Sequence, residues 1–520
     1  MTRDSIMDQN ETKTDDQLKA VDSIPGYLVL SDEESLAQLG HQQELKRQFS
    51  LTTLGALCLC LMATWEALST VIAEALLNGG APCLFYNFVL SFLCSVCIAS
   101  SLGEIAYIYP TAGGQYHWVA ALCPPRSRSL AAFTTGWISV GGLIVFCASA
   151  AFAAGLQTQS LIAVLLYSAA LNIWGSKMLP HANMISLSLT TPEGILHVVG
   201  CVVILVVLGV MAPKITASFV FTEVVNSSGW ENDGVSWLVG LISAVYPFLG
   251  YDAACHMAEE IPINAPRNVP IAMVGSVTVN GLMGLIYGTV LLFSTGLLES
   301  LLTTPTGFPF MQIYLDVTRS RAGATVLSLL VILIAIAAKV VGITSASRTL
   351  WAFARDRAVP FDSHFSYINK ILQVPVTSIV FVTVSQILLG FLYLANTTAF
   401  NAVLSMAIIG IYLSYSIPVA YMLFVGRSKL ARKEYGPFRL GPVVGPVLNA
   451  ITISLVWMTV VIIFSTFPSS QPVTAQNMNY STVVMAGWLV FGLVYYFIRG
   501  RAKFEVPVVV SDIVEGVRDI

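Results

Sequence analysis

The hydrophobic segment 237–257 is interrupted at its own midpoint, where Pro247, Gly250 and Asp252 stand. In hydrocarbon each unsatisfied backbone N–H or C=O costs several kcal/mol, so a broken helix persists only where protein or a water-filled cavity surrounds it. A carboxylate beside the break adds roughly 2.5–3.5 kcal/mol on insertion scales and needs a compensating partner. We therefore expect residues 246–252 to line a binding site in the middle of a membrane.

Composition places the chain among multi-pass membrane proteins. Of its 520 residues, 56% are hydrophobic and only 11% are charged, and the mean hydropathy is +0.76. Soluble domains carry about 25% charged residues, so this composition excludes an ordinary soluble enzyme. The net charge of -3 gives no reason to expect a nucleic-acid partner. The nine cysteines show no disulfide or zinc spacing, and we expect neither a cofactor nor a metal.

The polarity of the chain divides it into a tail, a membrane domain and a second tail. Residues 1–48 are polar and acidic, which predicts a mostly disordered N-terminal tail, and residues 49–499 form the expected membrane domain. Residues 500–520 form a short C-terminal tail. No signal peptide is recognisable, so we expect the first span to direct insertion. Lys13 and Lys19 are candidate acceptors for a ubiquitin ligase, although two lysines are common in any solvated tail.

Apolar stretches of about 20 residues, enough to cross a hydrocarbon core of ~30 Å, recur along the membrane domain. They predict an all-α membrane protein with twelve transmembrane helices. The fourth is the weakest because only about 15 apolar residues separate Ser160 from Gly175, and a polar insert at 186–194 follows. Eleven spans, with the C-terminus on the other side, is the alternative. The expected spans are 51–77, 83–108, 131–155, 160–175, 193–212, 236–258, 272–297, 323–350, 376–395, 402–425, 446–467 and 480–498.

Basic residues predict the orientation, because loops rich in Lys and Arg stay in the cytoplasm. Thirteen basic residues follow even-numbered spans and three follow odd-numbered spans, so we expect both termini in the cytoplasm. The glycosylation sequons at Asn226, Asn396 and Asn479 fall on the expected external side. The first group comprises Arg126, Arg128, Lys177, Arg267, Arg348, Arg355, Arg357, Lys370, Arg427, Lys429, Arg432, Lys433 and Arg439, and the second comprises Lys214, Arg319 and Arg321.

Three ionisable residues lie inside the expected spans: Glu66 in span one, Asp252 in span six and Lys339 in span eight. Left unpaired, they would together cost roughly 7–10 kcal/mol, which rivals the ~5–15 kcal/mol net stability of a typical domain. We expect them to face one another, water or a ligand, and to couple ion movement to transport. The structural alternatives are a helix–helix hydrogen bond for Glu66, a half-helix cap for Asp252 and a side chain reaching towards the cytoplasm for Lys339.

Four further residues have a functional and a structural interpretation. Tyr246 is a candidate aromatic lid over a substrate, or an ordinary packing residue. His256, one helical turn from Asp252, would relay protons or bond to a carbonyl. We expect Glu104 to be structural and Glu74 to be solvated near the outer end of span one.

Spans one and six fit equivalent positions in the two inverted five-helix halves of a secondary transporter, where both spans are interrupted. Free N–H groups at the start of a half-helix suit a substrate carboxylate, and free C=O groups at the end of a half-helix suit an ammonium. A zwitterionic amino acid satisfies both ends at once. A quaternary amine such as choline would instead use the aromatic faces of Trp65, Tyr246 and Tyr251.

Several motifs occur together along the chain. They are LNGG at 77–80, SLGEI at 101–105, YPTAGGQY at 109–116, GYDAA at 250–254 with the acidic pair at 259–260, SRTLWAFARDR at 347–357 and PVTAQNMNY at 472–480. In this combination the chain resembles the fungal amino acid/choline (GABA permease-like) branch of the amino acid–polyamine–organocation superfamily, from about residue 36 to 503. The motifs are specific to the family and not to one substrate.

The resemblance implies a leucine-transporter-like carrier with a five-plus-five inverted repeat and interrupted helices one and six, working by alternating access and commonly driven by protons. Helices three and eight would flank the site, and the segments 110–116 and 355–357 would gate its inner side. Ion coupling would fall to Asp252, Glu66 and Lys339. The implied substrate-binding residues are Thr64, Trp65, Glu66, Ala67, Leu68, Tyr246, Phe248, Gly250, Tyr251 and Asp252.

Three features depart from the family pattern. Pro247 stands where a small hydroxyl residue is expected and removes a backbone donor at the break. Lys339 is not an expected residue of span eight. The region 155–194 lacks part of the connection between spans three and four.

The expected function is proton-coupled import of an amino acid or GABA-like zwitterion across the plasma membrane, with the vacuolar membrane as the alternative location. Choline or another organic cation is the alternative substrate. A non-transporting nutrient sensor on the same scaffold is the alternative class of protein, although such sensors usually carry an enlarged cytoplasmic tail. An enzyme is not expected because no nucleophile–base pair or phosphate loop occurs, and neither pore loops nor rings of charge indicate a channel.

Overall fold

The computed structural model describes residues 42–158, 192–395, 399–429, 438–449, 454–475 and 477–507, with Leu36 and a few residues between 166 and 173. The predicted N-terminal tail with Lys13 and Lys19, most of the fourth span, most of the insert at 186–194 and the chain beyond Pro507 lie outside these residues. The ubiquitin ligase therefore stays a prediction. Residues Glu44–Pro507 form one compact unit, which contains all the elements below.

The described residues form helices, turns and loops, without strands. This confirms the all-α fold class. The helices are α3 Leu51–Met62, α4 Thr64–Ile108, α5 Gln115–Leu122, α6 Arg128–Thr158, α9 Pro192–Met211, α10 Ala217–Phe221, α11 Asp233–Val239, α12 Ile242–Val245, η1 Tyr246–Phe248, α13 Ala253–His256, η2 Ala258–Glu260, α14 Ala265–Phe293, α15 Leu298–Leu302, α16 Pro309–Thr318, α17 Arg321–Arg355, α18 Asp362–Phe365, α19 Val376–Ala395, α20 Ala399–Tyr421, η3 Met422–Gly426, α21 Arg427–Lys429, α22 Gly441–Asn449, α23 Ser454–Phe464, α24 Ser481–Tyr495, η4 Tyr496–Gly500 and α25 Arg501–Lys503.

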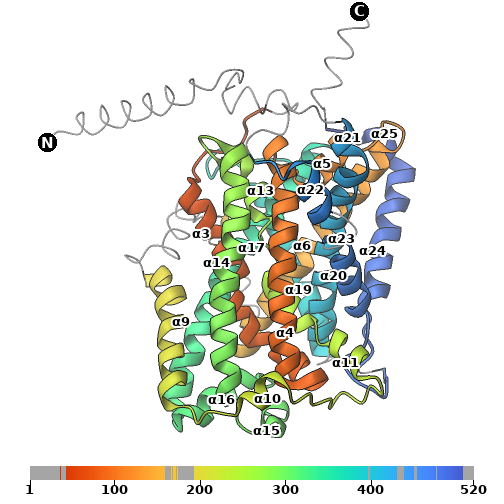
Figure 1. Cartoon of the computed structure of the whole chain (residues 1–520). Helices are drawn as coiled ribbons and strands as arrows, with labels where there is room; N and C mark the ends of the chain where they lie inside the picture. The colour runs from red at the N-terminus through yellow and green to blue at the C-terminus, as the bar shows by residue number, and fades with distance from the viewer. Residues whose placement is uncertain are drawn as a thin grey trace, which may run out of the picture. The chain divides into compact units, whose positions relative to one another are not determined.

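The long helices of this unit run side by side between two faces (Figure 1). We call the face that carries α5, α21 and α25 the terminal face, and the face that carries α10, α15 and α16 the opposite face. Within α4 the chain bends at Gly79, whose φ is 178°, and at Gly80, whose φ is +73°. The left-handed φ of Gly80 suits a residue without a Cβ, and it lets spans one and two join with a kink.

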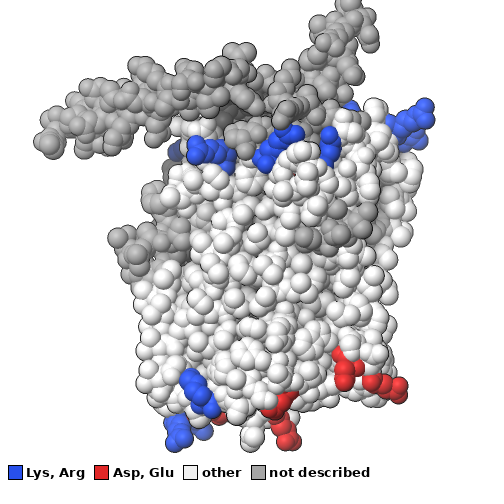
Figure 2. Space-filling view, in the orientation of Figure 1, with Lys and Arg blue, Asp and Glu red and all other residues white. Residues whose placement is uncertain are grey.

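Large apolar side chains face outward along the lengths of these helices. Leu93 of α4, Val210 of α9 and Phe491 of α24 are 58%, 80% and 57% exposed. Charged residues gather at the two ends of the unit, and the wide belt between them shows none on the side seen in Figure 2, apart from the atoms drawn grey. Among the described residues, eight helical segments are long and apolar enough to cross a membrane. This is the surface of a multi-pass membrane protein.

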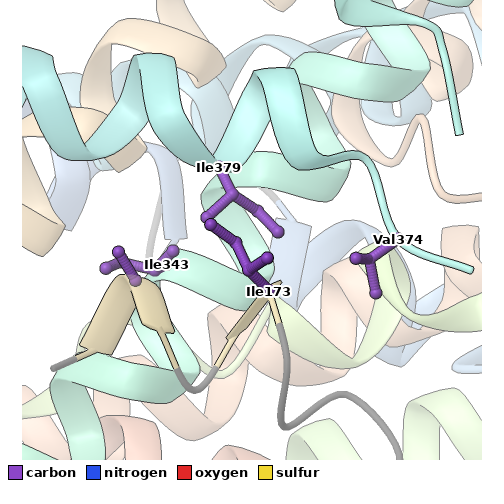
Figure 3. Packing of buried hydrophobic residues seen from close by; sticks show 5 residues of the cluster. Ile173, Ile343, Val374 and Ile379 are labelled. Atoms are coloured by element: carbon purple, nitrogen blue, oxygen red, sulfur yellow. The ribbon is translucent and has the colours of Figure 1, made fainter. Parts of the chain in front are cut away.

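Every expected span except the fourth corresponds to helices of the structure. The segment Leu51–Ile108 contains the first two, and shorter apolar helices, His197–Met211 and Val376–Phe391, correspond to the fifth and ninth. Of the fourth span, the described Ile173 packs in one apolar cluster with Ile343 of α17 and Ile379 of α19 (Figure 3). The number of crossings in this part of the chain lies outside the described residues.

Two of the three sequons lie within the described residues, and both asparagines are engaged in the fold. The Nδ2 atom of Asn226 donates to Trp230 O and to Asp233 Oδ1, both at 2.9 Å. The Nδ2 atom of Asn479 donates to Ser405 Oγ at 3.1 Å and to two backbone carbonyls. A glycan on either nitrogen would remove at least one of these donors, so neither sequon adds to the prediction of the outer side.

Candidate functional site

The first helix break lies at Ala63, between α3 and α4. Ala63 adopts a left-handed conformation with φ 39° and ψ 52°, which is uncommon for a residue with a Cβ. Its N–H donates to Leu59 O at 3.0 Å and its C=O accepts from Ala67 N–H at 2.7 Å, so one residue ends α3 and begins α4. The interruption therefore directly precedes the stretch 64–68, which we expected to bind substrate, and that stretch begins α4.

The second break interrupts span six where the sequence predicts it. The helix α12 continues into the short 3₁₀ turn η1, and Leu249 then becomes extended before α13 starts at Ala253. Gly250 has φ +98°, and a Cβ at this position would lie 3.0 Å from Leu61 and 3.1 Å from Phe146. Both the backbone conformation and the close packing favour glycine here.

The two breaks contact each other. The Thr64 hydroxyl donates to Pro247 O at 2.8 Å, which satisfies a carbonyl that η1 leaves free. Asn280 of α14 donates from its Nδ2 to Leu59 O at 3.0 Å, in the last turn of α3. The Thr64 hydroxyl thus replaces a hydrogen bond that the interrupted helix lacks, as buried broken helices require, and Asn280 adds a second donor to Leu59 O, which already accepts from Ala63 N–H.

A small cavity lies between the breaks. The lining comes from α3, α4, α6, α17 and Tyr246, so the expected helices three and eight do flank it. The described residues that line the cavity are Leu61, Met62, Ala63, Glu66, Ala67, Thr70, Phe146, Ala150, Ala153, Tyr246, Ala335 and Ala338.

Among the described residues that line this cavity, one is acidic, Glu66. It is 1% exposed. Its Oε1 lies 2.8 Å from Nδ1 of His197, on α9. Within the described residues its Oε2 has no hydrogen-bond partner. A buried carboxylate oxygen without a donor at a cavity wall is a candidate acceptor for a ligand N–H.

His197 is the functional candidate that the sequence interpretation missed. It lies in the apolar span 193–212, so the rule that marks ionisable residues inside a membrane would have found it had it been applied to histidine. Trp65 packs near it, with ring centroids 6.2 Å apart, and lies 5.1 Å from the ring of Tyr287. Trp65 therefore faces α9 and α14 and is not among the residues that line the cavity.

Asp252 lies outside the cavity lining that the structure describes, so its expected contact with the substrate stays a prediction. It is 1% exposed, and its Oδ2 accepts from Gln115 Nε2 at 2.8 Å. The same oxygen lies 3.3 Å from Nε2 of His256, and Nδ1 of His256 lies 3.2 Å from Ala112 O. Asp252 thus joins the break of span six to the segment around α5.

Lys339 is fully buried, and it does not extend towards the terminal face. Its Nζ donates to Cys147 O at 2.8 Å and also to the side-chain oxygen of Gln386. The alternative of a lysine reaching towards the cytoplasm is therefore wrong. Its neighbour Ala338 lines the cavity, so Lys339 stands directly behind the cavity wall.

The other predicted substrate residues divide between the cavity wall and its support. Ala67 and Tyr246 line the cavity, and the Tyr246 hydroxyl lies 2.8 Å from Ser149 Oγ. Phe248 stacks on Phe92 at a centroid distance of 5.8 Å. The remaining predicted substrate residues lie behind the wall and are not part of its described lining. They are Thr64, Trp65, Leu68, Phe248, Gly250, Tyr251 and Asp252.

Ion pairs join α17 to η2 on the terminal-face side of the cavity. Arg355 makes two hydrogen bonds to Glu259, of 2.8 and 3.0 Å, and Arg348 Nε donates to Glu260 at 3.0 Å. Glu259 also accepts from the N–H of Ala112 at 3.1 Å. The predicted gating segments 110–116 and 355–357 therefore meet around the end of span six.

Glu104 and Glu74, the two acidic residues expected near the ends of spans, are both buried. Glu104 forms an ion pair with Arg427 and accepts from Leu440 N–H at 2.9 Å, as expected for a structural residue. Glu74 is 6% exposed, so the expectation of a solvated residue is wrong. Its neighbour Ala75 donates its N–H to Ser243 Oγ at 3.0 Å, so span six packs closely on this part of span one.

Two broken helices facing one cavity inside an apolar helix bundle define a secondary transporter. The family model described as "Amino acid permease" matches residues 49–491. Because this match covers most of the chain, the chain belongs to the amino acid permease family.

Similar proteins come from fungi and plants. A choline transporter of Saccharomyces cerevisiae is 28% identical over 519 residues, which cover 96% of this chain and 88% of the relative. An uncharacterised amino-acid permease of Schizosaccharomyces pombe is 31% identical over 502 residues, covering 92% of this chain and 90% of the relative. An amino-acid permease of Arabidopsis thaliana is 28% identical over 509 residues, covering 92% and 96%.

A solved structure shares the fold. The crystal structure of a manganese transporter of Eremococcus coleocola superposes with a TM-score of 0.51 at 11% identity, covering 88% of this chain and 98% of that chain. At this identity the likeness concerns the fold alone. It confirms the leucine-transporter-like architecture that the motifs imply.

Proposed function

We propose that this permease imports an amino acid or a GABA-like zwitterion together with a proton. The observation that carries the proposal is Glu66, whose unpartnered Oε2 belongs to a buried carboxylate at the wall of a mostly apolar cavity. A substrate ammonium would donate to this oxygen and compensate its buried charge.

The second end of the substrate would bind at the start of α4. The first N–H groups of a helix have no partner within the helix, and they carry the positive end of its dipole. Here they follow Ala63, which itself lines the cavity. A substrate carboxylate at this point would lie within one helical turn of Glu66, a spacing that suits a short zwitterion.

Choline remains the alternative substrate because one relative is named a choline transporter. A quaternary ammonium has no N–H to donate and binds best within several aromatic faces. Of the three aromatic residues expected to form such a site, Tyr246 lines the cavity and Trp65 and Tyr251 are not among its described lining residues; Phe146 supplies a second aromatic face. The preference for a primary ammonium therefore rests on the unpartnered Oε2 of Glu66, which can accept from an N–H.

We place the terminal face in the cytoplasm of a plasma-membrane protein. The support is the excess of Lys and Arg in the loops of that face, which the positive-inside rule associates with the cytoplasm. The ion pairs of Arg355 and Arg348 with Glu259 and Glu260 would then keep the inner side closed. Opening of these pairs after substrate and proton have bound would release both inside.

Asp252 and Lys339 take supporting roles in this proposal. Asp252 would hold the break of span six against the segment 112–115, and so would transmit the state of the inner gate to the site. Lys339 would fix the distance between α6 and α17 through its bonds to Cys147 O and Gln386. Their contribution to ion coupling would thus be indirect.

Uptake by a permease-deficient host tests the function. Radiolabelled GABA, neutral amino acids, choline and a polyamine would be compared at two external pH values. We expect saturable uptake of at least one zwitterion, faster at the lower external pH. Uptake restricted to choline, at a rate independent of pH, would replace the proposed substrate. Signalling without any flux would instead indicate a nutrient sensor.

A further inference from the structure

The pair of Glu66 and His197 joins span one to span five at the cavity wall. The two atoms in contact are Oε1 and Nδ1, at 2.8 Å, and both side chains are at most 5% exposed. No expectation assigned a role to His197. Because an imidazole titrates near neutral pH, such a pair can hold either a net charge of minus one or no net charge.

The other polar and titratable groups that the structure describes around this pair are neutral at physiological pH. They are Cys201 from α9, Tyr287 and Asn280 from α14, and Tyr314 from α16. Thiols and phenols with ordinary pKa values near 8.5 and 10 carry no charge there. From α17, the buried cation Lys339 donates to Cys147 O and Gln386, and not to Glu66. The charge of the site therefore depends on one proton shared by Glu66 and His197.

Charge balance then links the proton to the substrate, given the zwitterion site proposed above. A zwitterion adds one positive and one negative charge, so a site with neutral His197 would keep a net charge of minus one while buried. One proton on His197 brings the filled site to zero. A monovalent cation such as choline brings the same site to zero without a proton, and a protonated His197 would repel it.

We infer that His197 sets the proton count of transport: one proton moves with each zwitterion and none with each monovalent organic cation. The proton enters from the outer solution, stays on the pair while the substrate is bound, and leaves to the inner solution, so one proton is taken up and one released in each cycle. His197 acts here as a positioning and charge-balancing residue beside Glu66.

The test is proton counting in proteoliposomes that contain the full chain. GABA and choline would be the probes, a pH-sensitive dye inside the vesicles would report protons, and valinomycin with potassium would clamp the membrane potential. For wild type we expect one proton per GABA and none per choline. Equal proton movement with both probes would overturn the inference without any variant.

Two matched variants locate the proton. His197→Gln keeps an amide donor for Glu66 but cannot titrate, so we expect GABA-driven proton movement to disappear while exchange of GABA across the membrane persists at a reduced rate. His256→Gln makes the same change in the other buried histidine–carboxylate pair, and we expect it to keep the wild-type proton count. Loss of proton movement in His256→Gln and not in His197→Gln would overturn the inference.

The same experiment separates failure of the proposed zwitterion substrate from failure of the inference about His197. If the protein moves choline and not GABA, the proposal of a zwitterion substrate fails. The inference about His197 is then supported by choline transport without protons and overturned by choline transport with them.

Discussion

Two buried carboxylate–histidine pairs lie near the helix breaks, and they differ in what surrounds them. Glu66 and His197 come from separate helices, and Glu66 lines the cavity. Among the described residues each carboxylate has one oxygen without a hydrogen-bond partner, Oε2 of Glu66 and Oδ1 of Asp252, so the position at the cavity wall is what distinguishes Glu66. Asp252 and His256 lie one turn apart on one segment, and Gln115 and Ala112 bind them from the far side. In the proposed function the same two chemical groups form a substrate site in one place and a structural joint in the other.

The largest expected difference between the pairs is in substrate uptake. Glu66→Gln removes the charge that would bind the substrate ammonium, and a hydrogen bond to a charged group contributes ~1.5–3 kcal/mol, so we expect about a 10- to 100-fold loss of kcat/KM. Asp252→Asn can still accept from Gln115, so we expect a loss of only a few fold. Initial uptake rates, corrected for surface expression, measure both. Equal losses would remove the distinction between site and joint.

The next expected effect concerns the gate to which the second pair is attached, since Ala112 contacts both His256 and Glu259. Arg355→Ala leaves Glu259 buried without its partner, and breaking a buried pair costs roughly 3–5 kcal/mol. We expect faster hydrogen exchange in the segment 110–122 and a higher rate of substrate efflux.

The matched control for the gate is Arg357→Ala. Arg357 pairs with Glu505, and both side chains are more than half exposed, at 58% and 61%. Exposed pairs contribute little, so its exchange pattern should stay at that of wild type. An equal response in the two arginine variants would mean that the ion pair with Glu259 does not hold the gate closed.

Sequence alone located the second break well and the first break less well. Pro247 and Gly250 mark the interruption of span six by composition, because each is unfavourable inside a helix. At the first break Ala63 adopts a left-handed conformation, and alanine is the best helix former, so no residue type announces this break. It depends on tertiary contacts such as the hydrogen bond from Thr64 to Pro247.

The site could be predicted only in part for a related reason. Intramembrane charge marked Glu66 and Asp252 as candidate residues, but their partners are distant in sequence: His197 is 131 residues from Glu66, and Gln115 is 137 residues from Asp252. Which carboxylate reaches the cavity depends on how these helices pack. The position of Glu66 at the cavity wall therefore follows from helix packing and not from any local sequence pattern.

A smaller effect is expected from Asp356, just beyond α17 at the terminal face. Burial raises the pKa of its carboxyl to about 7, above its ordinary value of 3.8, although Arg355 opposes the shift. Between these two values the folded protein binds more protons than the unfolded chain, so stability falls as the pH rises towards 7. We expect Asp356→Asn to reduce this decline in melting temperature. A decline that is unchanged in the variant would show that Asp356 is not its source.

The smallest effect separates two contributions of Tyr246 within the cavity. Tyr246→Phe keeps the aromatic face and loses the hydrogen bond to Ser149, which contributes ~0.5–1.5 kcal/mol. We expect KM for the substrate to rise about two- to tenfold with kcat nearly unchanged, because the change affects binding in the ground state and transition state alike. A large loss of kcat would instead assign the hydroxyl a part in the conformational cycle.

The central claim is that the substrate binds at Glu66, between the two helix breaks. The most direct measurement is an experimental structure of the permease with its transported substrate bound. The account predicts the substrate ammonium within hydrogen-bond distance of Glu66 Oε2 and its carboxylate at the first turn of α4. A substrate that contacts Asp252 and leaves Glu66 Oε2 without a partner would contradict it.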